Sequence, residues 1–363
     1  WEQRKLSEVL SSYTDPVEIP RTGYERLGIR SHAKGTFHNF VPAGHELQTA
    51  QMHRVAADKF IVNITFGWEH AVAVTDENDA GKLVSHRFPQ FSLSEELDTK
   101  FLKFIILDED FRHHLWLASP GGAGRNRVLN INEMLQYEIM IPNVPEQRKI
   151  ARMLIDIDNL ITLHQRKLDR LKNIKKSMLD KMFPKDGEVV PEIRFKGFTD
   201  AWEQRKLGEL ALFNPKDELP KIFEYVDLES VVGTEMLSHR TETKSSAPSR
   251  AQRVARIGDL FYQTVRPYQK NNYLFEKPYK NFVFSNGYAQ MRPFVDGYFM
   301  LCLVQSERFI KIVLDNCTGT SYPSINSNNL EEIEVYAPLN KKEGNKIGTM
   351  FRSIDNLITL HQR

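Results

Sequence analysis

Cysteine is scarce in this chain of 363 residues, which contains only Cys302 and Cys317. Two thiols argue against a disulfide framework and a cysteine-rich metal site, and they favour a reducing, cytoplasmic compartment. No apolar stretch approaches the roughly 20 residues that span a membrane, so we expect no membrane partner. The net charge is only +2. Any affinity for nucleic acid must therefore come from local basic patches rather than from a global excess.

The sequence also lacks the motifs of nucleotide and metal chemistry. No glycine-rich loop ends in Lys-Ser or Lys-Thr, which excludes the phosphate-binding loop of nucleotide hydrolases. The run Gly121-Gly-Ala-Gly124 lacks the dinucleotide-binding spacing, so a turn explains it better than a cofactor site. Glu242-Thr-Lys244 matches the end of a nuclease Glu-x-Lys pattern, but three residues are too few to predict catalysis. We expect no cofactor, no bound metal and no catalytic residue in this chain.

Two sequences, by contrast, occur twice. Ile-Asp-Asn-Leu-Ile-Thr-Leu-His-Gln-Arg is found at 157–166 and again at 354–363, and Trp-Glu-Gln-Arg-Lys-Leu at 1–6 and 202–207. A ten-residue identity is not a coincidence, so we infer an internal duplication. Between these segments the two halves look almost unrelated. The chain therefore carries two different domains on one repeated scaffold. We call these domains, about residues 1–143 and 202–341, the payloads.

The end of the first half has the periodicity of a long helix. From Pro145 to Met182 apolar residues recur at alternating intervals of four and three, the 3.5-residue period of a coiled coil. The second copy follows the same pattern until Arg363, so we expect it to be truncated. A helix of this length needs a partner, and its twin is the obvious candidate. The predicted seam comprises Ile150, Leu154, Ile157, Ile161, His164, Leu168, Ile347, Phe351, Ile354, Ile358 and His361.

His164 and His361 are polar interruptions of this seam. A polar residue at a seam position can fix the register of a coiled coil at some cost in stability. A buried or half-exposed histidine with an ordinary partner is the simpler interpretation. Neither histidine has carboxylate or cysteine neighbours at metal-ligand spacing in the sequence.

The composition divides the chain into five segments. The payloads contain short β-rich runs at 60–66, 259–265 and 282–284, separated by Gly, Pro, Ser and Asn turns. They also contain helical stretches, including 94–107 and 298–315. Each payload is therefore predicted to be an α+β domain of mixed strands. The expected boundaries are 1–143 and 202–341 for the payload domains, 144–184 and 342–363 for the helices, and 185–201 for a linker.

Basic, polar and aromatic side chains gather in loops of both payloads. Residues 239–270 have a local net charge of +5, and residues 21–39 carry four basic side chains against one acidic one. Arg and Lys anchor phosphates and read guanine, while Asn and Gln pair with adenine. A solvated basic face is the usual alternative. The loops 121–127 and 318–324 occupy equivalent places before a strand and a long helix. The candidate DNA-binding residues are Arg21, Arg30, His32, Lys34, Arg125, Asn126, Arg127, Arg240, Lys244, Arg250, Gln263, Arg266, Tyr268, Lys270, Ser321 and Tyr322.

Several motifs together resemble the specificity subunit of type I restriction–modification systems. They are Trp-Glu-Gln-Arg-Lys-Leu after Arg194–Asp200, Gly258-Asp-Leu with Val265-Arg-Pro267, Thr318-Gly-Thr-Ser-Tyr-Pro323, and Pro145-Glu-Gln-Arg-Lys-Ile150 before the heptad helix. The resemblance covers both halves in the expected order. It implies two target-recognition domains, 1–143 and 202–341, joined by two spacer helices that form an antiparallel coiled coil with pseudo-two-fold symmetry.

What the resemblance implies about function is equally specific. Each recognition domain would read one half of a split target in double-stranded DNA, and the helices would set the gap. The subunit would not be an enzyme. It would dock two methyltransferase subunits and further restriction subunits. Two alternatives of other classes stay open, a self-contained nuclease that uses Glu242 and Lys244, and a helical adaptor that binds only proteins.

Overall fold

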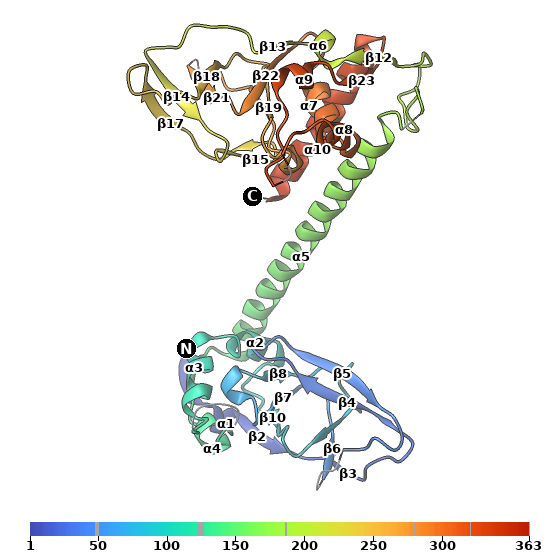
Figure 1. The fold of residues 1–363 in the computed structure, drawn as a ribbon. Coiled ribbons are helices and arrows are strands. Elements are labelled where there is room, and N and C mark those ends of the chain that lie inside the picture. Colours follow the sequence, from blue (N-terminus) through green and yellow to red (C-terminus); the bar gives the residue numbers. More distant parts are fainter. Residues whose placement is uncertain (48–50, 122–126, 186, 279–280, 320, 363) are drawn as a thin grey trace. The chain divides into compact units, whose positions relative to one another are not determined.

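The computed structural model describes residues 1–47, 51–121, 127–185, 187–278, 281–319 and 321–362. The chain forms two compact units, Trp1–Ile161 (unit 1) and Thr162–Arg363 (unit 2). Both units combine short strands with helices (Figure 1), which confirms the predicted mixed α/β content. No helix in the described ranges is both long enough and apolar enough to cross a bilayer.

Unit 1 is built on three sheets. The first pairs the start of the chain with the strand before the long helix, residue Glu2 lying opposite Ile141. The three sheets, in spatial order, are β1 (Glu2–Lys5) with β11 (Glu138–Ile141); β2 (Leu10–Tyr13), β10 (Gln90–Leu93), β7 (Lys59–Val62) and β8 (Val72–Val74); and β3 (Pro16–Val17), β6 (Met52–Arg54), β9 (Leu83–Ser85), β4 (Tyr24–Ile29) and β5 (Thr36–Val41).

Short helices cover the four-stranded sheet of unit 1. Their starts are set by Asp98, Asp108 and Asn130, whose side chains accept hydrogen bonds from the first free backbone N–H groups. Phe60 and Phe111 are fully buried between helix and sheet. The helices are α1 (Leu6–Val9), the 3₁₀ turn η1 (Gly67–Glu69), α2 (Thr99–Ile105), α3 (Glu109–Leu117) and α4 (Ile131–Met134).

Unit 2 shares one strand order with unit 1. In one four-stranded sheet of each unit, the first strand in sequence lies beside the fourth, followed by the second and the third. The sheets of unit 2 are β12 (Glu203–Lys206) with β23 (Glu334–Ala337); β13 (Ala211–Phe213), β22 (Tyr288–Pro293), β19 (Leu260–Gln263) and β20 (Tyr273–Leu274); β17 (Arg240–Thr243), β14 (Ile222–Val226), β21 (Phe282–Ser285) and β18 (Ala251–Val254); and the hairpin of β15 (Val231–Val232) and β16 (Glu235–Met236).

The helices of unit 2 pack around its largest core. α7 is almost entirely buried, and α10 packs against it through Ile347 and Phe351. A Cβ at position 348 would collide with the Asp296 carboxylate that caps α7, which explains the glycine there. The helices are α6 (Leu207–Leu210), the 3₁₀ turn η2 (Pro267–Gln269), α7 (Gly297–Gln305), α8 (Glu307–Asp315), α9 (Ser327–Glu331) and α10 (Lys341–Gln362).

The long helix α5 (Val144–Lys181) begins in unit 1 and ends in unit 2. In unit 1 the buried Gln147 side chain holds its first turn, because it donates to the carbonyls of Glu96 and Pro142. Of the predicted seam, Ile150 packs against the unit 1 core, while Ile157 and Ile161 are exposed.

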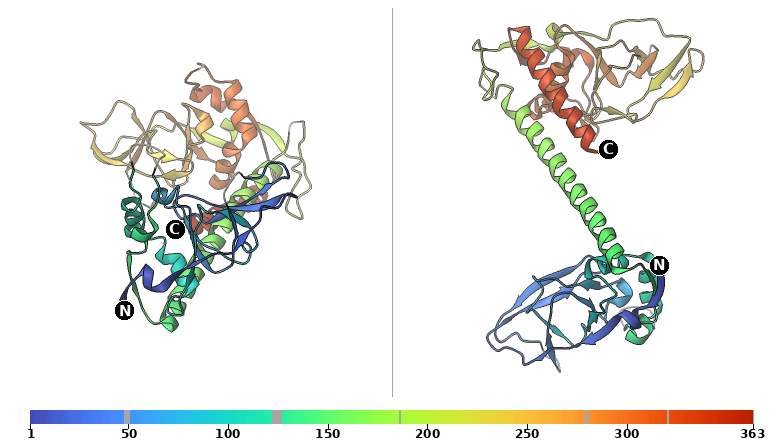
Figure 2. Two further views of the ribbon diagram at one scale, coloured as in Figure 1. Left: turned by 90° about the horizontal axis from the view of Figure 1, so that it is seen from below. Right: turned by 180° about the vertical axis from the view of Figure 1, so that it is seen from behind.

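Within unit 2, α5 and α10 lie side by side and run in opposite directions (Figure 2). His164 contacts His361, and Lys175 donates to Asp355, so the residue number rises along one helix as it falls along the other. In the part of α5 that belongs to unit 2, the half-buried residues include Leu168 of the predicted seam, whereas His164 is exposed.

The linker that follows α5 is fastened to the start of α10. Arg194 forms a two-pronged ion pair with Glu343, with Nε–Oε1 and Nη2–Oε2 distances of 2.6 and 2.9 Å. Glu343 is only 1% exposed. Nearby, Phe183 and Trp202 pack edge to face against each other in the core of unit 2.

Candidate nucleic-acid interface

Three loops of unit 2 meet where β19 ends. The backbone N–H of Arg266 donates to the carbonyl of Pro323, and that of Ile325 to Thr264, which ties the β19–η2 turn to the segment 321–325. The tip of the β15–β16 hairpin joins them, because Asn272 donates to the Gly233 carbonyl at 2.9 Å. We call this arrangement the loop cluster of unit 2.

Two residues at this turn have left-handed backbone. Arg266 and Lys270 flank η2 with φ angles of 53° and 57°. Such angles are uncommon for residues other than glycine, and they concentrate at functional sites where the surroundings enforce them. The surroundings here are the hydrogen bonds to the two neighbouring loops.

The loop cluster presents an aromatic and basic surface. The Arg266 guanidinium lies over the Tyr322 ring, 4.5 Å from its centroid. Tyr322 is 63% exposed and Tyr268 49% exposed. Ser321 is exposed beside Tyr322. These side chains can contact a phosphate, a sugar or a base without any rearrangement of the backbone.

Two other predicted residues of the cluster are occupied by internal contacts. Gln263 is buried, and its amide donates to the Val265 carbonyl at 2.6 Å and to Gln269 at 2.9 Å. Lys270 donates to the carboxylate of Glu307 at 2.8 Å and to a backbone carbonyl. Gln263 therefore supports the turn from within, and Lys270 joins it to α8.

Unit 1 has an equivalent loop cluster where β7 ends. The N–H of Leu129 donates to the Ile64 carbonyl, as Ile325 does to Thr264 in unit 2. The tip of the β4–β5 hairpin also docks on η1, because His32 and Ala33 donate to the carbonyls of Glu69 and His70, each at 2.8 Å. His32 and Ala33 both have positive φ angles.

An aromatic and basic stack lies at this second cluster as well. The guanidinium of Arg127 is 4.6 Å from the centroid of the Trp116 ring, and His113 stacks on the same ring. Trp116 is 45% exposed. Phe66, which precedes η1, is also exposed. Neither Trp116 nor Phe66 is recognisable as a site residue from the sequence, because only the fold brings α3 and η1 to the loop that carries Arg127.

The remaining predicted residues of unit 1 are placed as follows. Arg30 lies over the Phe37 ring and donates to the Thr36 carbonyl, so it belongs to the hairpin tip with His32 and Lys34. Arg125 and Asn126 lie outside the described residues. Arg21 precedes β4 and is therefore at the end of the hairpin remote from the tip.

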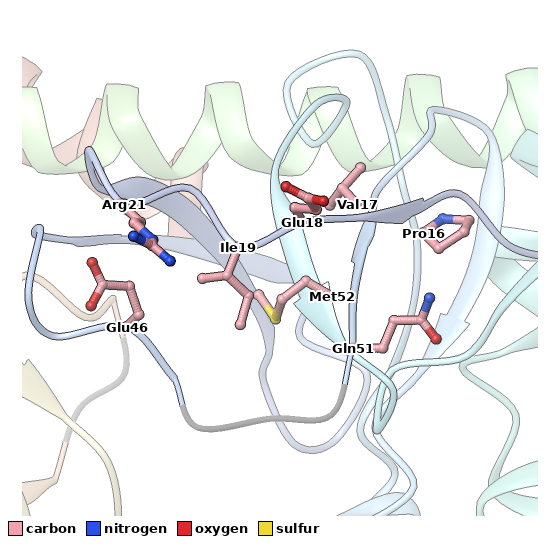
Figure 3. Close-up of a pocket in the computed structure, with 8 residues that line it drawn as sticks. All are labelled: Pro16, Val17, Glu18, Ile19, Arg21, Glu46, Gln51 and Met52. Atoms are coloured by element: carbon pink, nitrogen blue, oxygen red, sulfur yellow. The ribbon is translucent and has the colours of Figure 1, made fainter.

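Arg21 instead lines a hollow next to the paired strands β3 and β6, beside Glu46 (Figure 3). The pKa of Glu46 is lowered, chiefly by a hydrogen bond from the Gly44 N–H and in smaller part by the charge of Arg21. The other residues that line the hollow are Pro16, Val17, Glu18, Ile19, Gln51 and Met52.

In the sheet of unit 2 that contains β14, two of the predicted basic residues lie near the loop cluster and one lies at the opposite end. Arg240 lies over the Tyr225 ring near the hairpin, and ion pairs with Glu242 and Asp227 raise its pKa. The Arg250 carbonyl accepts a hydrogen bond from the N–H of Asn286, which directly follows β21 on the side of the loop cluster. The N–H of Lys244 donates to the Lys221 carbonyl at the opposite end of the sheet.

The described residues offer no catalytic constellation around Glu242. Its carboxylate accepts from Arg240 Nε at 3.0 Å and from the Ser246 hydroxyl at 3.2 Å. No group of three or more His, Cys, Asp or Glu side chains in the described ranges could hold a metal ion. The loop clusters are therefore the better candidate site.

The known proteins to which this chain is similar are described by their role in type I restriction specificity. Residues 48–173 match the family of the type I restriction modification DNA specificity domain. Over 262 residues the chain is 25% identical to the type I restriction enzyme MjaVIII specificity subunit of Methanocaldococcus jannaschii, a match that covers 62% of this chain and 57% of that protein. The chain thus spans less than two thirds of the length of this curated relative.

Solved structures share the fold. The HsdS subunit from Thermoanaerobacter tengcongensis superposes with a TM-score of 0.52 at 16% identity, over 100% of this chain and 91% of that one. A structure described as the basis of complex assembly and conformational transition of the type I R-M system gives a TM-score of 0.50 at 17% identity, over 99% of this chain and 91% of that one.

Proposed function

We propose that this chain, a member of the type I restriction–modification specificity family, is a DNA-recognition subunit whose two units each read one half of a bipartite target. The observation that carries the proposal is the pair of loop clusters. Both have the same backbone framework, a 3₁₀ turn tied to a hairpin tip and to the segment before the last strand. Their exposed side chains differ, as the readers of two different half-sites require.

The chemistry of each cluster fits double-stranded DNA. Arg and Lys bind phosphates, and guanidinium groups and hydroxyls can also reach base edges. In unit 2 the contacts would come from Arg266, Tyr268, Ser321 and Tyr322. In unit 1 they would come from Arg30, His32, Lys34 and Arg127. The two sets place different donors on one framework, so an asymmetric target follows.

The helices α5 and α10 would act as the spacer between the two readers. The contacts of His164 with His361 and of Lys175 with Asp355 support an antiparallel coiled coil. The matching strand order of the sheet β2-β10-β7-β8 in unit 1 and the sheet β13-β22-β19-β20 in unit 2 supports a pseudo-two-fold repeat of the scaffold. A rigid antiparallel pair would hold the two readers at one separation, as protein geometry does in other dimeric readers.

Repeated leucines supply a docking surface for partner proteins. Leu160 and Leu163 of α5 are exposed, and so are Leu357 and Leu360, the same residues of the second copy. Exposed apolar side chains at identical repeat positions are suited to bind the same partner twice. Two methyltransferase subunits are the proposed occupants, with restriction subunits joining the assembly in the cytoplasm. The chain itself would carry no catalytic residue, because base flipping and chemistry belong to the partner.

The spacer can be tested with the assembled complex and synthetic DNA. Once the methylated sequence has been read from the host genome, its gap is lengthened by two base pairs. We expect methylation to be lost, because the second half-site moves along and around the helix. Unchanged methylation would overturn the fixed spacing. Salt-insensitive association with partner proteins and no DNA binding by the assembled complex would instead favour the protein-only adaptor, because phosphate contacts weaken with salt.

A further inference from the structure

We propose that His164 and His361 form a binding site for a divalent transition metal ion, which fastens α10 to α5. The two Nδ1 atoms are 3.0 Å apart, and the ring centroids are 5.1 Å apart. The histidines are 197 residues apart in the sequence, and each is the eighth residue of the repeated decapeptide. Antiparallel pairing thus places two identical ligands face to face.

The separation of the nitrogens suits a shared cation. Imidazole nitrogens bind such ions at about 2.0–2.1 Å, which puts two of them about 2.9 Å apart at a right angle and about 3.3 Å apart at a tetrahedral angle. The observed 3.0 Å lies between these values. A right-angle arrangement is that of square-planar copper and nickel sites with nitrogen and oxygen ligands. Water would complete the coordination, since His164 is exposed.

Metal binding would rearrange the protons of the pair. A metal binds the neutral imidazole. Without a metal, one ring must donate its Nδ1 proton to the other. On binding, that ring carries its proton on Nε2 instead, and both Nδ1 lone pairs face the ion. The exchange changes the tautomer and releases no proton.

The consequence would be a second fastening of the helix pair. Lys175 and Asp355 already join the helices at 2.6 Å. His164 lies eleven residues before Lys175 on α5, about 16 Å away at 1.5 Å per residue. A metal at the histidines would therefore hold the last turn of α10, which the ion pair does not reach.

The test is a titration of the full, untagged chain with Ni²⁺ after treatment with a chelator. We expect one equivalent to bind, and the affinity to fall at least tenfold in His164→Gln and in His361→Gln. Glutamine preserves the helix and a polar group, and circular dichroism verifies the fold of each variant. His45→Gln, in an exposed loop of unit 1, is the matched control and should bind as the wild type does.

A spectroscopic measurement separates a shared site from a single ligand. With Cu²⁺ in place of Ni²⁺, electron paramagnetic resonance should show two equivalent nitrogen ligands in the wild type. Each glutamine variant should lose that pattern. Equal Ni²⁺ affinity in the wild type and both variants would overturn the proposal and leave a hydrogen-bonded pair of histidines. A loss in only one of the two variants would overturn it too, since it would show one adventitious histidine ligand.

Discussion

The guanidinium of Arg266 lies over the ring of Tyr322, 4.5 Å from its centroid, although 56 residues separate them. The stack exists because Arg266 donates its backbone N–H to Pro323, directly after the tyrosine. A planar cation on an aromatic support is well suited to contact a phosphate or a guanine edge.

Arg266→Ala should weaken DNA binding by the assembled complex. If the guanidinium neutralises one phosphate, the slope of log affinity against log salt should fall by about one. Fluorescence anisotropy with a labelled duplex measures both quantities. Arg352→Ala is the matched control. Arg352 also lies over a tyrosine ring, that of Tyr298, but it belongs to α10 and not to a loop cluster. Equal losses in the two variants would contradict a role for Arg266 in DNA contact.

Tyr322→Ala and Trp116→Ala should act on different half-sites. Each ring supports an arginine, and a good arginine–base pair is worth about 1–3 kcal/mol of discrimination, roughly 5- to 150-fold in affinity. Competition assays with duplexes altered in one half-site identify the half that each variant no longer discriminates. We expect Tyr322→Ala to relax one half and Trp116→Ala the other. If both variants relax the same half, the assignment of one half-site to each unit fails.

Glu343→Ala should destabilise unit 2 strongly. The variant leaves Arg194, which is mostly buried, without the partner that raises its pKa. Loss of one member of a buried ion pair lowers the free energy of unfolding by about 3–5 kcal/mol. Hydrogen exchange of peptides from α7 and α10 in the full chain measures the effect. The double variant Arg194→Met with Glu343→Leu should recover much of the stability. No recovery would mean that the pair specifies the linker path beyond its charge.

Unit 1 should lose stability as the pH falls below about 6.5, the ordinary pKa of histidine. Burial lowers the pKa of His70, whose Nε2 donates to the Ile106 carbonyl at 2.7 Å. Below 6.5 the unfolded chain therefore binds a proton that the folded unit does not, and unfolding becomes easier until the lowered pKa is reached. Exchange rates of residues 59–75 across this pH range measure the loss.

His70→Asn is the variant that isolates this effect. His70 has a φ of 59°, a left-handed conformation that asparagine tolerates, and its amide is also a donor. The variant should lose the part of the pH dependence that comes from position 70. An unchanged pH profile would assign the effect to other groups.

Regular periodicity made the long helix predictable. The expected span from Pro145 to Met182 differs by one residue at each end from the observed α5, Val144–Lys181. The stretch 298–315, expected as one helical region, divides into α7 and α8 at Ser306, whose extended backbone ends one helix while its hydroxyl caps the next. A serine inside an apolar run shows no such break in the sequence alone.

The loop clusters were predictable only in part. Arg266 and Tyr322 were both candidates, but no local sequence pattern pairs them. They meet because Val265 and Ser324 form an isolated β-bridge across 59 residues. Gln263 was expected as a DNA contact and is instead buried in hydrogen bonds to its own turn. Polarity and position in a loop do not reveal which side of a turn a side chain faces.

The first and last strands of each payload pair with each other. In unit 1 β1 pairs with β11, and in unit 2 β12 pairs with β23. The entry strands carry the same letters, Glu-Gln-Arg-Lys, at 2–5 and 203–206. Genetic exchange with breakpoints in these ladders would bring in a new payload whose entry strand already matches the old one. Under the proposed function, such a scaffold would acquire a new DNA target in one recombination event, without any change in α5 or α10.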